Sequence, residues 1–147
     1  MRMIDVGAKP ATERVAVARG LVEISRATLA LVRRGEVEKG DVIAAARLAG
    51  VMAAKRTPDL VPLCHPISLS GVEVEIRSRA AGLEVMATVR TVDRTGVEME
   101  ALAAVAGACL TIYDMLKRHE RGMRIAEIVL VEKKGGRSGH WKRSPRG

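Results

Sequence analysis

The sequence predicts an α+β domain: a ferredoxin-like antiparallel sheet with helices on one face and one added helix. Segments with the two-residue alternation of strands and segments with the helical period follow in the order strand, two helices, two strands, helix, strand. Two βαβ-type halves can be traced in that order. The chain has 147 residues, of which 48% are apolar, so we expect a single domain over residues 1–147 with a sizeable core.

The beginning of the chain predicts a strand followed by a helix. Residues 14–24 are rich in Val, Ala and Leu, a composition typical of a buried strand. Ser25 has a side-chain oxygen that can accept from a free N–H group of a helix start. Gly35 can end that helix after about residue 34. We therefore expect the strand to lead directly into a short helix.

A second helix is predicted over residues 42–55. Its apolar positions follow the helical period, and Asp41 can cap its first turn. Pro58 should end the helix, because proline disfavours the helical conformation of the residue before it. Residues 60–66 contain two more prolines, so we expect a loop there.

A hairpin is predicted next. Apolar and charged side chains alternate over residues 72–77, as they do in a strand with one buried face. Residues 83–89 repeat the two-residue alternation after a turn at 80–82, and two such segments form an antiparallel hairpin. A strand over 125–131 and a mobile, glycine-rich basic tail over 135–147 complete the prediction.

The longest predicted helix follows the hairpin. Thr95 and Glu98 have the spacing of a capping box, in which each side chain accepts from the backbone N–H of the other residue. The helix should run to about Arg118 and stop no later than Gly122. Its apolar stripe should face the core and consists of Leu102, Val105, Cys109, Ile112 and Leu116.

The opposite face of this helix has small residues in its middle and polar residues at its ends: Glu100, Ala103, Ala104, Gly107, Thr111, Asp114 and Lys117. A solvated face explains this pattern. An interface with catalytic groups at its ends explains it too, because small residues let another backbone approach closely. Asp114 and Lys117 are neighbours on the helix surface, either as a plain salt bridge or as an acid–base pair beside a phosphate.

Glu100 and Asp114 should not meet at one reaction centre within one chain. Their separation in sequence corresponds to about 21 Å along a helix at about 1.5 Å per residue. If both act on the same substrate, the site combines two chains. We therefore predict an oligomer with its active sites at subunit interfaces.

The charge of the chain indicates an anionic partner. A formal net charge of +8 suits nucleic acid, a membrane surface or a phosphorylated small molecule. Tyr113 and Trp141 are the only aromatic residues besides histidine, so the stacking platform of single-strand binders is missing. No basic stretch is long enough for a nucleic-acid arm. A phosphorylated metabolite is the favoured ligand, with no nucleic acid and no membrane as partner.

The cysteines and the chain start indicate a cytoplasmic location. Cys64 and Cys109 do not make a disulfide framework. Residues 1–9 do not have the pattern of a secretory signal, and no apolar run reaches the roughly 20 residues of a membrane span. A structural zinc site needs about four ligands at recognisable spacing, whereas only Cys64 and His65 are adjacent, so we expect no metal site.

Three local features could serve chemistry or binding, and each also has a structural explanation. His65 can move protons near neutral pH, but it is a lone loop histidine. Lys39 precedes a helix start, where an anion is favoured, but it could be a solvated lysine beside a cap. Residues 135–139 could wrap a phosphate, but they lack the Walker pattern and could be a flexible tail.

Five segments nevertheless form a specific set: MIDVGAK (3–9), KGDVIAAARLAGVMAAKRTPDLVPLCHP (39–66), TGVEMEAL (95–102), LTIYDMLK (110–117) and GGRSG (135–139). In this order they resemble the cyclic pyranopterin monophosphate synthase family of molybdenum-cofactor biosynthesis. The resemblance implies a ferredoxin-like fold and a homohexamer built as a trimer of dimers. It implies a lyase that converts (8S)-3',8-cyclo-7,8-dihydroguanosine 5'-triphosphate to cyclic pyranopterin monophosphate and releases pyrophosphate.

The resemblance also implies residue roles. Asp114 would be catalytic, with Lys117 and Lys39 beside it, and His65 has chemistry that suits proton transfer. The substrate-binding residues would be Leu63, Cys64, His65, Met99 and Glu100, together with the charged residues Lys9, Arg14, Lys55 and Lys133. No cofactor is required, although Mg²⁺ could accompany the triphosphate.

One position departs from the family pattern, which has lysine where this chain has Arg137. Arginine binds phosphate but does not readily give up a proton, so it suits charge binding only. Our hypothesis is that Asp114 and Lys117 transfer protons while Lys39 and other cations hold the triphosphate. The alternatives are a non-catalytic RNA-binding protein, indicated by net charge only, and a regulator that binds a phosphometabolite without chemistry.

Overall fold

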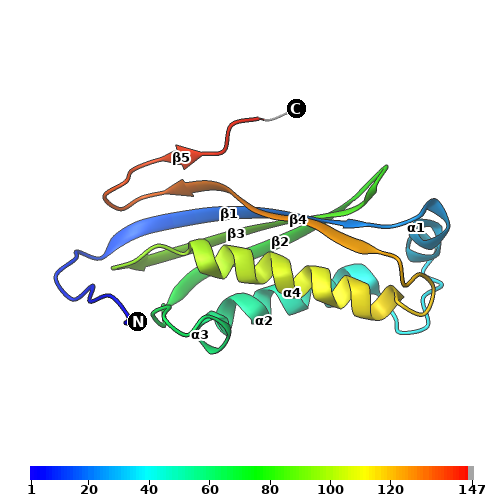
Figure 1. Cartoon of the computed structure of the whole chain (residues 1–147), viewed down its shortest axis with the longest axis horizontal. Helices are drawn as coiled ribbons and strands as arrows, with labels where there is room; N and C mark the ends of the chain where they lie inside the picture. Colours follow the sequence, from blue (N-terminus) through cyan, green and yellow to red (C-terminus); the bar gives the residue numbers. More distant parts are fainter. Residues whose placement is uncertain (146–147) are drawn as a thin grey trace.

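The computed structural model describes residues 1–145 and contains one antiparallel sheet with the strand order β2-β3-β1-β4-β5 (Figure 1). The strands are β1 (Thr12–Glu23), β2 (Leu69–Arg79), β3 (Gly82–Asp93), β4 (Arg124–Lys134) and β5 (Trp141–Lys142). The helices are α1 (Arg26–Arg33), α2 (Val42–Lys55), α3 (Thr57–Leu60) and α4 (Glu98–Leu116). Strands β1 to β4, with helices between β1 and β2 and between β3 and β4, have the ferredoxin-like order, so the predicted α+β fold is confirmed.

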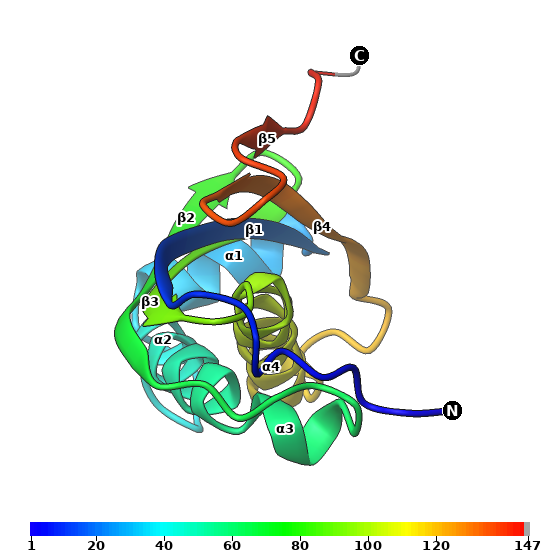
Figure 2. The ribbon, with the colours of Figure 1, turned by 90° about the vertical axis from the view of Figure 1, so that its left-hand side faces the viewer.

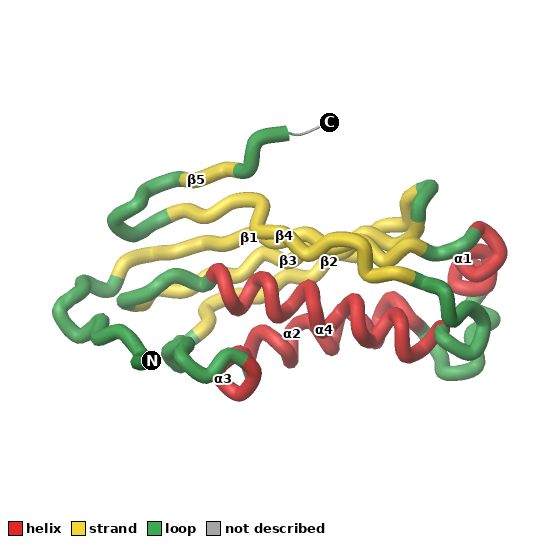
Figure 3. The backbone as a smooth tube through the Cα atoms, viewed as in Figure 1, coloured by secondary structure: helices red, strands yellow, loops and turns green. Residues whose placement is uncertain are grey.

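The sheet and the two longest helices form two layers. Figure 2 shows α2 and α4 side by side under one face of the sheet, and Figure 3 shows the same separation of helices from strands. Alternate residues of the central strand β1 point into this core, where Ala16, Ala18 and Val22 are fully buried. The predicted placement of helices on one face is therefore confirmed.

The first two predicted helices are present. The N–H of Thr28 donates to Ser25 Oγ at 3.3 Å at the start of α1. The N–H of Ala44 donates to Asp41 Oδ1 at 3.0 Å at the start of α2. Each side chain satisfies one of the N–H groups that a helix start leaves without a partner. The prediction for α2 has the observed bounds.

The short helix α3 was not predicted. Pro58 was expected only to end α2, but it lies in the first turn of α3. Proline is tolerated there because an N–H in the first turn has no partner within the helix. Thr57 is fully buried, and its hydroxyl donates to the carbonyl of Ala54 at 2.9 Å, which joins α3 tightly to the end of α2.

The predicted capping box at the start of α4 is wrong. The helix begins at Glu98, its N-cap residue is Val97, and no side chain caps it. Thr95 therefore lies too early to cap the helix. The predicted apolar stripe is correct: Val105, Cys109, Ile112 and Leu116 are fully buried, and Leu102 packs against the core.

Helix α4 is long and apolar enough to span a membrane by length and composition. More than half of it is buried inside the protein, between the sheet and α2, which is the environment of a core helix. Its small-residue face, for which the sequence left a solvated face or an interface open, packs on α2 of the same chain. A Cβ on Gly107 would lie 2.6 Å from Ala53 Cβ, and one on Gly50 would lie 3.0 Å from the Ala104 carbonyl oxygen.

The predicted tail contains a strand that the sequence did not indicate. Strand β5 pairs with the end of β4, and the N–H of Arg143 donates to the carbonyl of Val131 at 2.8 Å. The Arg143 Nε also donates to the carbonyl of Leu130 at 2.7 Å. Residues 146–147 of the predicted tail lie outside the described residues. Mobility of the tail stays a prediction.

Candidate active site

A carboxylate between two lysines lies at the C-terminal end of α4. Asp114 Oδ1 accepts from Lys117 Nζ at 2.7 Å, and Asp114 Oδ2 accepts from Lys39 Nζ at 2.9 Å. Lys117 is one helical turn beyond Asp114. Lys39 comes from the segment before α2. Helix α2 runs in the opposite direction to α4, so it begins near the end of α4 (Figure 1). The structure therefore brings together three of the four predicted catalytic residues.

The two lysines keep Asp114 ionised. A hydrogen bond from Lys117 and a weaker contribution from the hydrogen bond of Lys39 lower the pKa of Asp114 to about 2. All three side chains are about half exposed, so water screens the two salt bridges. A phosphate with its larger negative charge can therefore draw the lysines away from the carboxylate.

A buried acid lies at the opposite end of α4. Glu100 is only 2% exposed, and its Oε1 accepts from the Cys64 thiol at 3.7 Å. Its Oε2 is buried without a hydrogen-bond partner among the described residues. Burial raises the pKa of Glu100, and burial together with the Glu100 charge raises the pKa of Cys64 to about 11. A ligand that donates a hydrogen bond would satisfy the free carboxyl oxygen.

The other predicted residues of this end flank Cys64 or Glu100 in sequence. His65 follows Cys64 and is half-buried, whereas Leu63 and Met99 are 45% and 39% exposed. Apolar side chains left exposed beside a buried carboxyl group can cover the face of a flat ligand. Lys55 is exposed at the end of α2 and makes no ion pair or side-chain hydrogen bond with other described residues.

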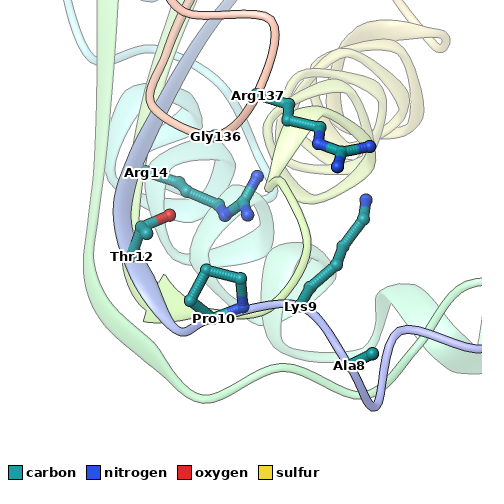
Figure 4. Close-up of a pocket in the computed structure, with 7 residues that line it drawn as sticks. All are labelled: Ala8, Lys9, Pro10, Thr12, Arg14, Gly136 and Arg137. Atoms are coloured by element: carbon teal, nitrogen blue, oxygen red, sulfur yellow. The ribbon is translucent and has the colours of Figure 1, made fainter.

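A cationic cavity of about 370 Å³ lies where the N-terminal segment meets the start of β1 (Figure 4). Its lining contains three cationic side chains and no acidic one: Ala8, Lys9, Pro10, Thr12, Arg14, Gly136 and Arg137. Arg14 is 8% exposed and is held by its Nε, which donates to the Asp93 carbonyl at 3.1 Å. The cavity thus presents fixed positive charge, which suits a phosphate.

Lys133 connects this cavity to the start of α4. Its Nζ donates to Ser138 Oγ at 2.7 Å and lies 3.8 Å from Glu98 Oε1. The sequence had assigned Glu98 to the capping box, so this role was missed. Thr12, which also lines the cavity, was absent from the predicted site, and Arg137 was predicted only to be suited to charge binding. The glycines around Arg137 were a usable signal, whereas nothing around Thr12 indicated it.

The predicted residues therefore form two groups at opposite ends of α4. Asp114, Lys117 and Lys39 lie at its C-terminal end, and the buried acid Glu100 lies in its first turn. The helix separates Glu100 from Asp114 by about 21 Å. Within one chain they do not form a single site, as the sequence predicted.

The comparisons with known proteins agree over almost the whole chain. Residues 3–136 match the model of the MoaC family. A cyclic pyranopterin monophosphate synthase of Thermomicrobium roseum is 61% identical over 144 residues, which is 97% of this chain and 87% of that protein. Proteins of the same name from Cereibacter sphaeroides and Novosphingobium aromaticivorans are 58% and 55% identical, over 97% and 96% of this chain and 91% and 90% of those proteins.

Proposed function

Because this chain belongs to the MoaC family, as its motifs predicted, we propose that it is a cyclic pyranopterin monophosphate synthase of molybdenum-cofactor biosynthesis. Its substrate is then (8S)-3',8-cyclo-7,8-dihydroguanosine 5'-triphosphate, and its products are cyclic pyranopterin monophosphate and pyrophosphate. The observation that carries the proposal is the carboxylate of Asp114, the aspartate of the IYDM motif, which accepts hydrogen bonds from Lys39 and Lys117.

The chemistry needs both a proton acceptor and fixed cations. The purine-derived ring opens and is rebuilt, and a ribose hydroxyl attacks the α-phosphate. The new P–O bond closes the cyclic phosphate while the bond from that phosphorus to the pyrophosphate oxygen breaks. The attacking hydroxyl loses its proton, and negative charge develops on the leaving pyrophosphate. Lysine and arginine side chains stabilise that charge.

Asp114 becomes a proton acceptor when substrate binds. With both lysines bound to it, its pKa of about 2 makes it a weak base. When phosphate groups attract Lys39 and Lys117, the carboxylate loses the hydrogen bonds that lowered its pKa, and its basicity rises. Lys117 remains one turn away and can exchange the proton. Binding of the phosphates thus raises the basicity of Asp114.

The other end of the site binds the rest of the substrate. Glu100 and Cys64 meet the polar edge of the ring system, Leu63 and Met99 cover it, and His65 takes part in proton transfer. Phosphate oxygens are held by the cations at this end, which are Lys9, Arg14, Lys55 and Lys133. No further cofactor is required. A Mg²⁺ ion would arrive as the counter-ion of the triphosphate.

Two subunits build each site in this proposal, since the two residue groups lie at opposite ends of α4. We propose a cytoplasmic homohexamer, a trimer of dimers. Asp114→Asn and Arg14→Ala should each be inactive alone. After the two variants are mixed and reassembled, about a quarter of wild-type activity should return, because half of the pairs are mixed and half of their sites are intact. No recovery in reassembled mixed oligomers would contradict a shared site.

The function is tested by incubating the protein with the cyclised triphosphate and measuring pyrophosphate. Wild type should release pyrophosphate, whereas Asp114→Asn should bind the substrate but not turn it over. Asp59→Asn is the matched control, because Asp59 forms an exposed pair with Arg56 at 3.7 Å outside both residue groups. Turnover by Asp114→Asn at the wild-type rate would remove Asp114 from the mechanism. An RNA-binding protein or a regulator would release no pyrophosphate.

A further inference from the structure

The Gly135–Gly139 loop, the turn between β4 and β5, lies directly against β1. Gly135 and Gly136 have φ values of +92° and +76°, which other residues rarely adopt. A Cβ on Gly135 would collide with the carbonyl oxygen of Glu13, and one on Gly136 would collide with Nη1 of Arg14. Two consecutive glycines therefore let this loop reach the guanidinium group that lines the cationic cavity.

Both ends of the loop are held. On the β4 side, Lys133 donates to Ser138 Oγ at 2.7 Å. On the β5 side, Lys133 pairs with Trp141 across the two strands, and the N–H of Gly139 donates to the carbonyl of Gly136 at 3.2 Å. The loop thus presents Arg137 to the cavity from a backbone that is fixed on both sides.

The cations lie at different depths. Arg14 is 8% exposed, so its guanidinium group forms part of the cavity floor, whereas Arg137 is exposed and lies at the mouth. Figure 4 shows the ends of Arg14, Arg137 and Lys9 directed toward the same space. None of the three forms an ion pair with a carboxylate of the described residues. A buried guanidinium group without a counter-ion is unfavourable, and a bound anion removes that penalty.

We propose that Arg137 is a specificity-determining residue that makes this cavity select a diphosphate group over a single phosphate. The inference rests on the proposed function, in which the leaving group is pyrophosphate. One phosphoryl group binds the buried Arg14 at the floor, and the second binds Arg137 at the mouth, where Lys9 is also exposed. The planar guanidinium fork can contact two oxygens of the outer phosphoryl group, which a lysine at the same position cannot do equally well.

The test is titration calorimetry with inorganic pyrophosphate and, separately, orthophosphate. Arg137→Ala should weaken pyrophosphate binding about tenfold, the effect of losing one charged hydrogen-bond donor, and change orthophosphate binding by less than about twofold. Arg137→Lys keeps the charge without the fork and should weaken pyrophosphate binding about threefold. Arg79→Ala removes the same charge at the opposite end of the sheet. Arg79 is the last residue of β2 and pairs with Gly82 of β3, and its removal should leave both affinities unchanged.

The inference is overturned if Arg137→Ala binds pyrophosphate as wild type does, or if it loses affinity for both anions equally. Thermal unfolding checks that the variants are folded; no loss is expected, because Arg137 makes no hydrogen bond or ion pair with other described residues. The titration does not need the cyclised triphosphate. Arg137-dependent pyrophosphate binding without turnover therefore contradicts the proposed function alone. If the protein turns over the cyclised triphosphate but Arg137→Ala has the pyrophosphate affinity of wild type, only this inference is contradicted.

Discussion

Gly107 determines how closely α4 approaches α2, and its replacement by alanine tests that packing. The added methyl group would lie 2.6 Å from Ala53 Cβ and 3.2 Å from the Ala49 carbonyl oxygen. Nonbonded carbon atoms prefer about 3.5–4.0 Å, so the helices must separate locally by about 1 Å. Lys39 precedes α2 and Asp114 lies on α4, so this separation also strains the contact between them.

The magnitude follows from two opposing effects. Alanine favours a helix over glycine by about 1 kcal/mol. Overpacking of a filled interface costs about 1–3 kcal/mol. We expect Gly107→Ala to lower the free energy of unfolding by about 1–2 kcal/mol, because helix backbone as well as a side chain opposes the methyl group. For a chain of this size, the melting temperature then falls by about 2–8 °C.

The assay is urea and thermal unfolding of a double-mutant cycle with Ala53→Gly, which removes the opposing methyl group. In the Ala53→Gly background, Gly107→Ala should destabilise the protein much less, because the gain in helix propensity then opposes only the 3.2 Å approach to the Ala49 carbonyl oxygen. Turnover should fall in Gly107→Ala and recover in the double variant. Equal destabilisation by Gly107→Ala in both backgrounds would refute the claim that these two positions set the helix spacing.

Three further predictions follow from the pKa shifts. Glu100 has a raised pKa, so its ionisation opposes folding above its ordinary value of 4.5; Glu100→Gln should be more stable than wild type at pH 7 but not at pH 4 in urea unfolding, and less active. The Cys64 pKa of about 11 should make its alkylation by iodoacetamide slow at pH 8, and Glu100→Gln should accelerate it, as mass spectrometry can measure. Asp114, with a pKa of about 2, stays ionised in the free protein, so its titration should add no inflection to the pH profile of wild-type kcat/KM between pH 4 and pH 8.

Local patterns predicted most of the secondary structure. The Asp41 cap and the helical period of the following residues were sufficient for the bounds of α2, because a helix satisfies its backbone hydrogen bonds within itself. The Thr95–Glu98 pattern failed because α4 begins at Glu98, two residues later than a capping box with Thr95 requires, and the Glu98 side chain faces Lys133 of β4 instead. Strand β5 was missed because two residues have no measurable alternation and are held by pairing with β4.

The sequence by itself determined the order of strands and helices, the apolar face of α4, the family, and the Asp114–Lys117 neighbourhood, because these depend on residues within a few turns of each other or on ordered motifs. Only the tertiary structure decided that α2 covers the small-residue face of α4. It also brought Lys39 to Asp114, buried Glu100 beside Cys64, and gathered Lys9, Arg14 and Arg137 around one cavity. Those contacts join residues far apart in the chain, and they arise from packing rather than from any local period.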